Sequence, residues 1–378
     1  MLECARCNNG LTHPVIGDTE APLVFSSAAL ILLIPASVIP IMSVVSFGIE
    51  RLDRLPTGVE ALWSGGFAPL ASVIFLCSIG VPFVQLALLI RVLAGVRFGP
   101  SAGLGRLFRW ANELRPWAML EVYLVGCCVA YTRLQDVGNV RVEGGGWCLV
   151  AATVCVLLTD MSLNERSIWR ELPTEHYPPA SGSEVSCPSC QLLLPGRFAG
   201  QCCPRCRARL HRRKPNSLRR ATALVIAGFA LYVPANLLPV LSIERFGREE
   251  PNTILGGVGE LVSSGLWPLA VIVFMASILV PVCKLFGLSL LLILTHRQSP
   301  RWLLGRTRAY RFIEFIGRWS SIDLFMISIL VALVQFGALT RIRPEPGAIA
   351  FAAVVIITMF ASRSFDPRLM WDRTAGRP

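Results

Sequence analysis

Long, almost uninterrupted apolar segments recur along the chain and are separated by shorter polar stretches. They lack the polar face that an amphipathic helix shows at a period of 3.6 residues. A helix needs about 20 apolar residues to cross a bilayer, so each segment predicts a transmembrane helix. We place the eight helices at Leu23–Val45, Phe67–Leu93, Trp117–Leu134, Gly144–Met161, Ala221–Ile243, Leu266–Leu294, Trp319–Leu339 and Gly347–Ala361. The predicted fold class is an all-α polytopic membrane protein.

The second half of the chain repeats the first. IPASVIPIMSV at Ile34–Val44 matches VPANLLPVLSI at Val233–Ile243, an offset of 199 residues, and further Pro, Trp and acidic positions follow in register. Each half contains four predicted helices, an even number, so both halves enter the membrane from the same face. We therefore expect two parallel repeats of four transmembrane helices, related by an axis roughly along the membrane normal.

A motif typical of a zinc ribbon lies between the halves. CPSC at Cys187–Cys190 and CPRC at Cys203–Cys206 are separated by twelve residues. Each CxxC turn can present two thiolates to the same side of a metal, so the four cysteines predict one closed, tetrahedral Zn²⁺ site. The alternative is a pair of coincidental CxxC turns or a disulfide. Four protein ligands leave no open position, which favours a structural role for the zinc.

The N-terminus carries part of a second ribbon. At the same offset of 199 residues, Cys4 matches Cys203 and Cys7 matches Cys206, but no first knuckle precedes them. Two thiolates alone do not complete a zinc site. Either the real start lies upstream, or this ribbon has degenerated, or His13 or another chain supplies ligands. Cys4 and Cys7 are therefore only possible ligands of a partial site.

The distribution of basic residues predicts the orientation of the chain. The net charge of +12 accompanies a charged content of only 16%. Loops that flank membrane segments explain this balance better than nucleic-acid binding does. The loops after the second and sixth helices and the central linker are rich in Arg. By the positive-inside rule, these loops, the ribbon and both termini are cytoplasmic. The predicted domains are a partial ribbon (1–20), a four-helix domain (21–170), the ribbon (180–215) and a second four-helix domain (216–378).

Polar side chains within the predicted helices are candidates for function, because a charge in lipid is costly and is retained for a reason. Lys284 is one of only two lysines, and Gln85 occupies its place in the first half. The alternative for Lys284 is a side chain that snorkels to the cytoplasmic interface. Asn236 lies between two prolines in the fifth helix, and Thr358 lies in the otherwise apolar eighth helix, where such a residue usually bonds its own helix.

Four further residues at helix ends are candidates for transport or proton coupling. Glu121 and Asp323 occupy matching first turns, where the helix dipole also favours an acid. Arg133 and Asp136 are spaced i, i+3 at the outer end of the third helix and can form an ion pair or a gate. The chain has no Walker loop, GxSxG or HExxH motif, and its four histidines lie outside the predicted helices. Nothing here favours an enzyme.

Taken together, the motifs resemble the paraquat-inducible protein A family. The resemblance rests on CPxC…CPRC, PANLLPV, SILVPVCKL, GRWSSIDLF and the closing ASRSFDPRLMWD, and it covers essentially the whole chain. The missing first knuckle departs from the family pattern. The resemblance implies a multi-pass protein of the Gram-negative inner membrane that works with a periplasmic MCE-domain tunnel protein in phospholipid trafficking and envelope integrity.

The function that we predict is therefore non-enzymatic transport of membrane lipids, with an MCE-domain protein as partner and zinc as cofactor. Two alternatives come from other classes of function. In one, the chain is a metal- or redox-responsive membrane scaffold in which the ribbon senses and the helices relay. In the other, it exports a small solute without an MCE-domain partner.

Overall fold

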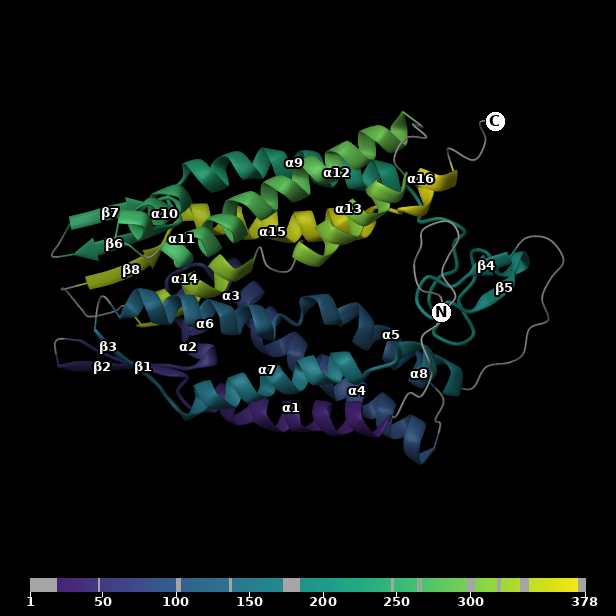
Figure 1. The fold of residues 1–378 in the computed structure, drawn as a ribbon, viewed down its shortest axis with the longest axis horizontal. Coiled ribbons are helices and arrows are strands. Elements are labelled where there is room, and N and C mark those ends of the chain that lie inside the picture. The colour runs from purple at the N-terminus through teal and green to yellow at the C-terminus, as the bar shows by residue number, and fades with distance from the viewer. Residues whose placement is uncertain are drawn as a thin grey trace. The chain divides into compact units, whose positions relative to one another are not determined.

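The computed structural model of the chain describes residues 19–46, 48–99, 103–135, 138–172, 184–245, 248–263, 265, 267–297, 303–317, 321–333 and 340–372. Helices predominate in this part, and three small antiparallel sheets accompany them (Figure 1). The chain divides into two compact units. The first comprises Met1–Pro35, Gly80–Ala118 and Cys148–Pro215, and the second comprises Ala36–Ile79, Met119–Trp147 and Asn216–Pro378.

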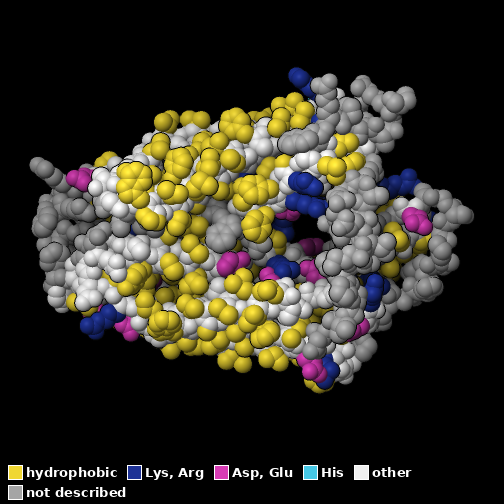
Figure 2. All heavy atoms as spheres, viewed as in Figure 1, with side chains coloured by type: hydrophobic (Ala, Val, Ile, Leu, Met, Phe, Trp, Pro, Cys, Tyr) yellow, Lys and Arg dark blue, Asp and Glu magenta, His cyan; other side chains and the backbone are white. Residues whose placement is uncertain are grey.

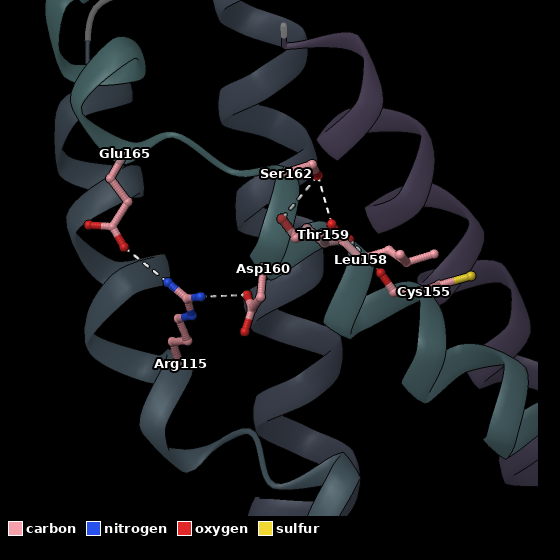
Figure 3. Close-up of polar contacts among 7 residues, drawn as sticks. All are labelled: Arg115, Cys155, Leu158, Thr159, Asp160, Ser162 and Glu165. Atoms are coloured by element: carbon pink, nitrogen blue, oxygen red, sulfur yellow. Dashed lines mark hydrogen bonds and ion pairs between the residues drawn. The ribbon is translucent and has the colours of Figure 1, made fainter. Parts of the chain in front are cut away.

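The first unit combines helices from the first half with the ribbon. It contains most of α1 (Glu20–Val38) and α7 (Gly144–Ser162), all of α4 (Val81–Phe98), α5 (Leu104–Leu114), η2 (Arg115–Trp117) and α8 (Glu165–Glu171), and the ribbon elements β4 (Glu184–Ser186), β5 (Leu193–Pro195) and η3 (Gly196–Phe198). Arg115 ties two of these helices together, because its guanidinium contacts Asp160 at 2.9 Å and Glu165 at 3.0 Å (Figure 3). This bridge holds the end of α7 beside the start of α8.

The second unit takes elements from both halves. The first half contributes β1 (Met42–Ser46), β2 (Ile49–Asp53), α2 (Leu55–Ser64), α3 (Ala68–Phe75), most of η1 (Leu76–Gly80), α6 (Leu120–Leu134) and β3 (Asn139–Val142). The second half contributes α9 (Ser217–Leu237), β6 (Leu241–Arg245), β7 (Arg248–Asn252), α10 (Ile254–Ser263), α11 (Trp267–Phe274), η4 (Met275–Leu279), α12 (Val280–His296), α13 (Leu303–Ile316), α14 (Ile322–Leu333), β8 (Thr340–Pro344), α15 (Pro346–Ser364) and α16 (Arg368–Asp372).

Two three-stranded sheets in this unit occupy matching places of the sequence repeat. One has the strand order β2-β1-β3 and the other β7-β6-β8, with antiparallel pairing throughout. Their edges match in detail: the amide of Ile41 donates to the carbonyl of Asp53, and the amide of Val240 donates to the carbonyl of Asn252. The internal repeat seen in the sequence is thus a repeat of hydrogen-bonded sheets as well as of helices.

These sheets correct the all-helical prediction. The first and fifth predicted helices were expected to reach Val45 and Ile243, but α1 ends at Val38 and α9 ends at Leu237. A proline stands two residues beyond each end, and the residue before a proline disfavours helical backbone. The β-branched and apolar residues that follow form β1 and β6 instead.

The helices supply seven candidate membrane spans within the described residues. They are Glu20–Val38, Ala68–Phe98, Leu104–Leu134, Gly144–Ser162, Ser217–Leu237, Ala270–His296 and Pro346–Ser364. The seventh predicted helix corresponds to α14, which is apolar but is described over only 12 residues. On the face shown in Figure 2, hydrophobic side chains predominate over the helices. That each half of the chain contains four membrane spans stays a prediction.

A π-helical turn interrupts the same long helix in both halves. η1 separates α3 from α4, and η4 separates α11 from α12. A fully buried serine lies in each of them, Ser78 in the first half and Ser277 in the second. Such turns are frequent at functional sites. Their position directs attention to α12, which carries Lys284.

Candidate functional site

Four cysteine sulfurs meet inside the ribbon. The Sγ atoms of Cys187, Cys190, Cys203 and Cys206 all lie within 4.8 Å of one another, and all four residues are buried. The Sγ atoms of Cys187 and Cys206 are 3.5 Å apart, and those of Cys190 and Cys203 are 3.6 Å apart. The two CxxC motifs therefore face each other and form one site.

Both knuckles of the ribbon have the same backbone shape. The amides of Cys187 and Cys203 each donate to the carbonyl five residues further on, at 2.9 and 2.8 Å. The residue after each second cysteine, Gln191 or Arg207, has a left-handed backbone with a φ of 58° or 56°. That conformation costs a non-glycine residue about 1 to 2 kcal/mol. The left-handed conformation occurs in both knuckles, and the sulfurs of the two resulting turns point toward a common centre.

The spacing of the sulfurs fits a metal ion with four thiolate ligands. Zinc–sulfur bonds of about 2.3 Å in a tetrahedron place the sulfurs about 3.8 Å apart. A disulfide requires about 2.05 Å between sulfurs, and the four cysteines are free thiols. The arrangement can therefore hold a metal.

The ribbon packs on helices of the first unit. Its buried cysteines share one apolar cluster with residues of α4, α5 and α8, in which the rings of Phe108 and Trp169 are 4.8 Å apart. At Gly105 the backbone of α5 comes so close to the second knuckle that an added Cβ would lie 2.2 Å from the carbonyl oxygen of Arg205. Only glycine permits this approach, so α5 and the metal-binding loop form one packed body.

The structure brings together two of the polar candidates in the helices. Lys284 in α12 is fully buried, and its Nζ donates to the hydroxyl of Thr358 in α15 at 3.0 Å. The carbonyl of Gly317 accepts a second, longer hydrogen bond of 3.5 Å. The hydroxyl of Thr358 in turn donates to the carbonyl of Val355 at 2.9 Å. Among the described residues, the ammonium thus has neutral oxygens as its hydrogen-bond partners.

The other polar candidates lie apart from Lys284 or outside the described residues. The side-chain amide of Asn236 donates to the carbonyl of Tyr232 on its own helix at 2.9 Å, so this polar side chain has a hydrogen-bond partner within α9. Glu121 stands in the first turn of α6 and Arg133 in its last turn. Cys4, Cys7, Asp136 and the side chain of Asp323 lie outside the described residues.

An open pocket with a cavity volume of about 50 Å³ lies in the second unit. Its apolar lining is formed by Val240, Leu241, Ile243, Ile254, Val273, Met326 and Ile327, and its polar lining includes Arg133, Asn252, Thr253 and Glu260. Arg133 comes from the first half of the chain, whereas the other lining residues come from the second half. The pocket therefore combines a long apolar wall with one cation and one acid.

The sequence analysis missed both the pocket and one buried acid. Asp53 at the end of β2 is 1% exposed. It lies in a short polar stretch between two predicted helices, where an acid is unremarkable. The repeat contained one indication that the position of Asp53 accepts a neutral side chain. The matching residue of the second half is Asn252, an uncharged side chain of the same shape.

The family model described as "Paraquat-inducible protein A" matches residues 19–173 and 218–375 of this chain. The chain belongs to this family. The matched segments cover the helices and sheets of both halves and leave the ribbon between them. Family membership and the seven candidate spans together make the chain a multi-pass membrane protein.

Three relatives of the paraquat-inducible protein A family show how far the similarity extends. "Intermembrane transport protein PqiA" of Escherichia coli strain K12 is 34% identical over 98% of this chain and 90% of the relative. "Lipophilic envelope-spanning tunnel protein A" of the same strain is 32% identical over 88% of this chain and 77% of the relative. A "Probable intermembrane transport protein" of Haemophilus influenzae is 28% identical, with coverages of 98% and 90%. No solved structure matches significantly.

Proposed function

We propose that this chain is an inner-membrane subunit that moves phospholipids between the membranes of a Gram-negative cell, together with a periplasmic MCE-domain protein. Two of the relatives carry the words "intermembrane transport" in their names, and a third is named for an envelope-spanning tunnel. The chain shares nearly its full length with two of them. In this account it supports envelope integrity and catalyses no reaction.

The pocket of the second unit is the observation that carries the proposal. Val273, Met326 and Ile327 form an apolar wall on α11 and α14, and the guanidinium of Arg133 lies at the same pocket. A phospholipid combines acyl chains with a phosphate, and arginine pairs with phosphate through two parallel hydrogen bonds. In the predicted orientation the pocket lies toward the periplasm, where a tunnel protein would take the lipid.

Lys284 supplies a means of driving the movement. Among the described residues the ammonium contacts neutral oxygens. A buried ammonium in such surroundings is costly, so it binds an anion or exchanges a proton readily. In our proposal it attracts a lipid phosphate, or it takes up and releases a proton as the helices change shape. The sequence has no ATP-binding motif, so the energy comes from the proton gradient or from the partner.

The cysteine cluster acts as a structural zinc site in this proposal. Cys187, Cys190, Cys203 and Cys206 would bind Zn²⁺ as thiolates on the cytoplasmic side, and the metal supplies folding energy to a small domain. Because the cluster is buried and packed on α5, its burial argues against a sensor that exchanges metal or redox equivalents with solvent.

Two glycines of α10 provide a matched test of the pocket. Gly257 lines the pocket, and an added Cβ would lie 3.9 Å from the guanidinium of Arg133, so Gly257→Leu fills the space without a clash. At Gly259 an added Cβ meets nothing within 4 Å, so Gly259→Leu makes the same gain in helix propensity outside the pocket. We expect Gly257→Leu to lose the phospholipid that co-purifies with wild type, as measured by mass spectrometry, and Gly259→Leu to keep it. If both variants co-purify with equal amounts of phospholipid, the pocket is not the phospholipid-binding site.

The same experiment separates the alternatives. A small-solute exporter would hold no phospholipid in wild type, and a metal-responsive scaffold would lose its function with the ribbon cysteines but not with Gly257→Leu. Sensitivity of cells to detergent, measured with the same variants, connects the bound lipid to envelope integrity.

A further inference from the structure

One buried carboxyl group lies outside every part of the proposed transport path. Asp53 ends strand β2, its side chain is 1% exposed, and neither carboxylate oxygen has a hydrogen-bond partner among the described residues. An ionised carboxylate in such surroundings is strongly unfavourable, because neither solvent nor a donor compensates its charge. A protonated carboxyl group is uncharged, so its burial avoids this free-energy cost.

Among the described residues, the charged and titratable groups around Asp53 provide no counter-ion. Among the neighbours on α6, Tyr123 and Cys127 interact with it electrostatically, and neither carries a positive charge. Strand β1 has no titratable residue. The charged residues of β2 and its junction with α2, Glu50, Arg51 and Arg54, are exposed, as is Glu60 of α2. The titratable residue of α14 is Asp323, whose side chain lies outside the described residues. Burial alone raises the pKa of Asp53 well above its ordinary value.

The internal repeat supplies an independent argument. Asn252 matches Asp53 in the second half, and the carbonyls of both residues accept the same edge hydrogen bond of the sheet. Asparagine has the shape of a protonated aspartic acid and carries no charge. The fold at this position therefore accommodates a neutral side chain, and the second half uses one permanently.

The surroundings of the two matching positions differ in one respect. Asn252 lines the open pocket together with Gly257. In the first half the match of Gly257 is Gly58, where an added Cβ would lie 2.2 Å from the hydroxyl of Ser328 in α14. Here α2 and α14 are in close contact, so the first-half counterpart of the pocket is closed around Asp53.

We propose that Asp53 is a proton-binding site, occupied while β2 and α2 are packed on α14, and emptied only when these elements move apart. On release, the O–H bond of the carboxyl group breaks, the electron pair stays on the carboxylate, and the proton passes to water. Water must reach the side chain for this to happen. Proton occupancy at Asp53 is thereby coupled to the packing of first-half elements on α14 of the second half.

The sign of the pH dependence follows from the raised pKa. The folded protein keeps the proton at a pH where the unfolded chain has lost it, so the stabilisation is complete below the unfolded pKa. It is lost as the pH rises through the folded pKa. The wild-type melting temperature should therefore fall with rising pH over this window, and Asp53→Asn should remove that part of the slope and be the more stable form at alkaline pH.

The test uses the full chain in lipid nanodiscs, with Glu50→Gln, an exposed acid of the same strand, as control. Infrared spectra at neutral pH should show the carbonyl stretch of a protonated aspartic acid in wild type and Glu50→Gln, and its loss in Asp53→Asn. Labelling aspartate with carbon-13 shifts the band and assigns it to an aspartic acid in wild type alone, in case Asp53→Asn fails to fold. Absence of a protonated aspartate band in the labelled wild type would overturn the proposal. An Asp53→Asn variant with an unchanged pH slope of melting would overturn it too.

Discussion

At the scale of residues, ionisable groups are buried where the other half of the repeat has an amide. Lys284 matches Gln85, and Asp53 matches Asn252. Both ionisable members are at most 1% exposed. Since a neutral amide satisfies the same fold in the matching half, the ammonium and the carboxyl group are not required for packing. Their chemistry, the binding of a proton or an anion, is the reason that we assign to them.

Replacing Lys284 by the residue of the other half tests its role. Lys284→Gln removes the charge but keeps a donor for Thr358, so we expect the protein to fold and its lipid transfer to fall at least about tenfold, which corresponds to about 1.4 kcal/mol. The conservative control is Lys214→Gln, which removes the other lysine, in the central linker. Transfer by Lys284→Gln at the wild-type rate would show that the ammonium has no part in transport.

The cysteine cluster gives a second prediction at this scale. Cys203→Ser removes one of four ligands, and because three thiolates hold zinc less well, we expect the metal content to fall from about one zinc per chain to a small fraction of that. Cys202→Ser alters the exposed neighbouring cysteine and should keep full metal content. Elemental analysis of the purified proteins measures the zinc content per chain. A wild type without stoichiometric zinc would contradict the assignment of the four cysteines as a zinc site.

At the scale of elements, the helices were predictable and the strands were not. Long apolar runs predict membrane helices by length and hydropathy. The residues of β1 and β6 continue those runs, and periodicity alone does not separate a short apolar strand from the end of a helix. The prolines that follow Val38 and Leu237 are the sequence feature that indicates where these two helices end. The CxxC spacing correctly predicted that the four cysteines converge, and that they bind zinc stays a prediction.

The contact between α5 and the ribbon leads to a prediction for Gly105. A methyl group there meets the carbonyl oxygen of Arg205, so Gly105→Ala must push the knuckle away, at a cost of about 1 to 3 kcal/mol. We expect a lower melting temperature and faster loss of zinc to a chelator. Arg106→Ala, an exposed change in the same turn, should behave as wild type in both measurements. Unchanged chelation kinetics in Gly105→Ala would mean that the ribbon is not held by α5.

At the scale of the whole molecule, elements of the two halves interlock within the second unit. Helix α6 of the first half packs on α14 of the second, where an added Cβ at Gly126 would lie 3.2 Å from Cβ of Phe325, and the rings of Tyr123 and Phe325 are 5.4 Å apart. Arg133 of α6 lies in the pocket that the second half otherwise lines. The repeat was evident from sequence, but this exchange of elements depends on tertiary packing, so neither the pocket nor the burial of Asp53 could be foreseen.

We propose that this chain passes phospholipid to a partner that spans the envelope. The direct measurement places the purified chain in donor vesicles that contain fluorescent phosphatidylethanolamine, adds the MCE-domain partner, and follows transfer to acceptor vesicles. We predict that wild type and Gly259→Leu accelerate transfer, whereas Gly257→Leu and Lys284→Gln do not. Transfer at the same rate with and without the wild-type chain would contradict the account.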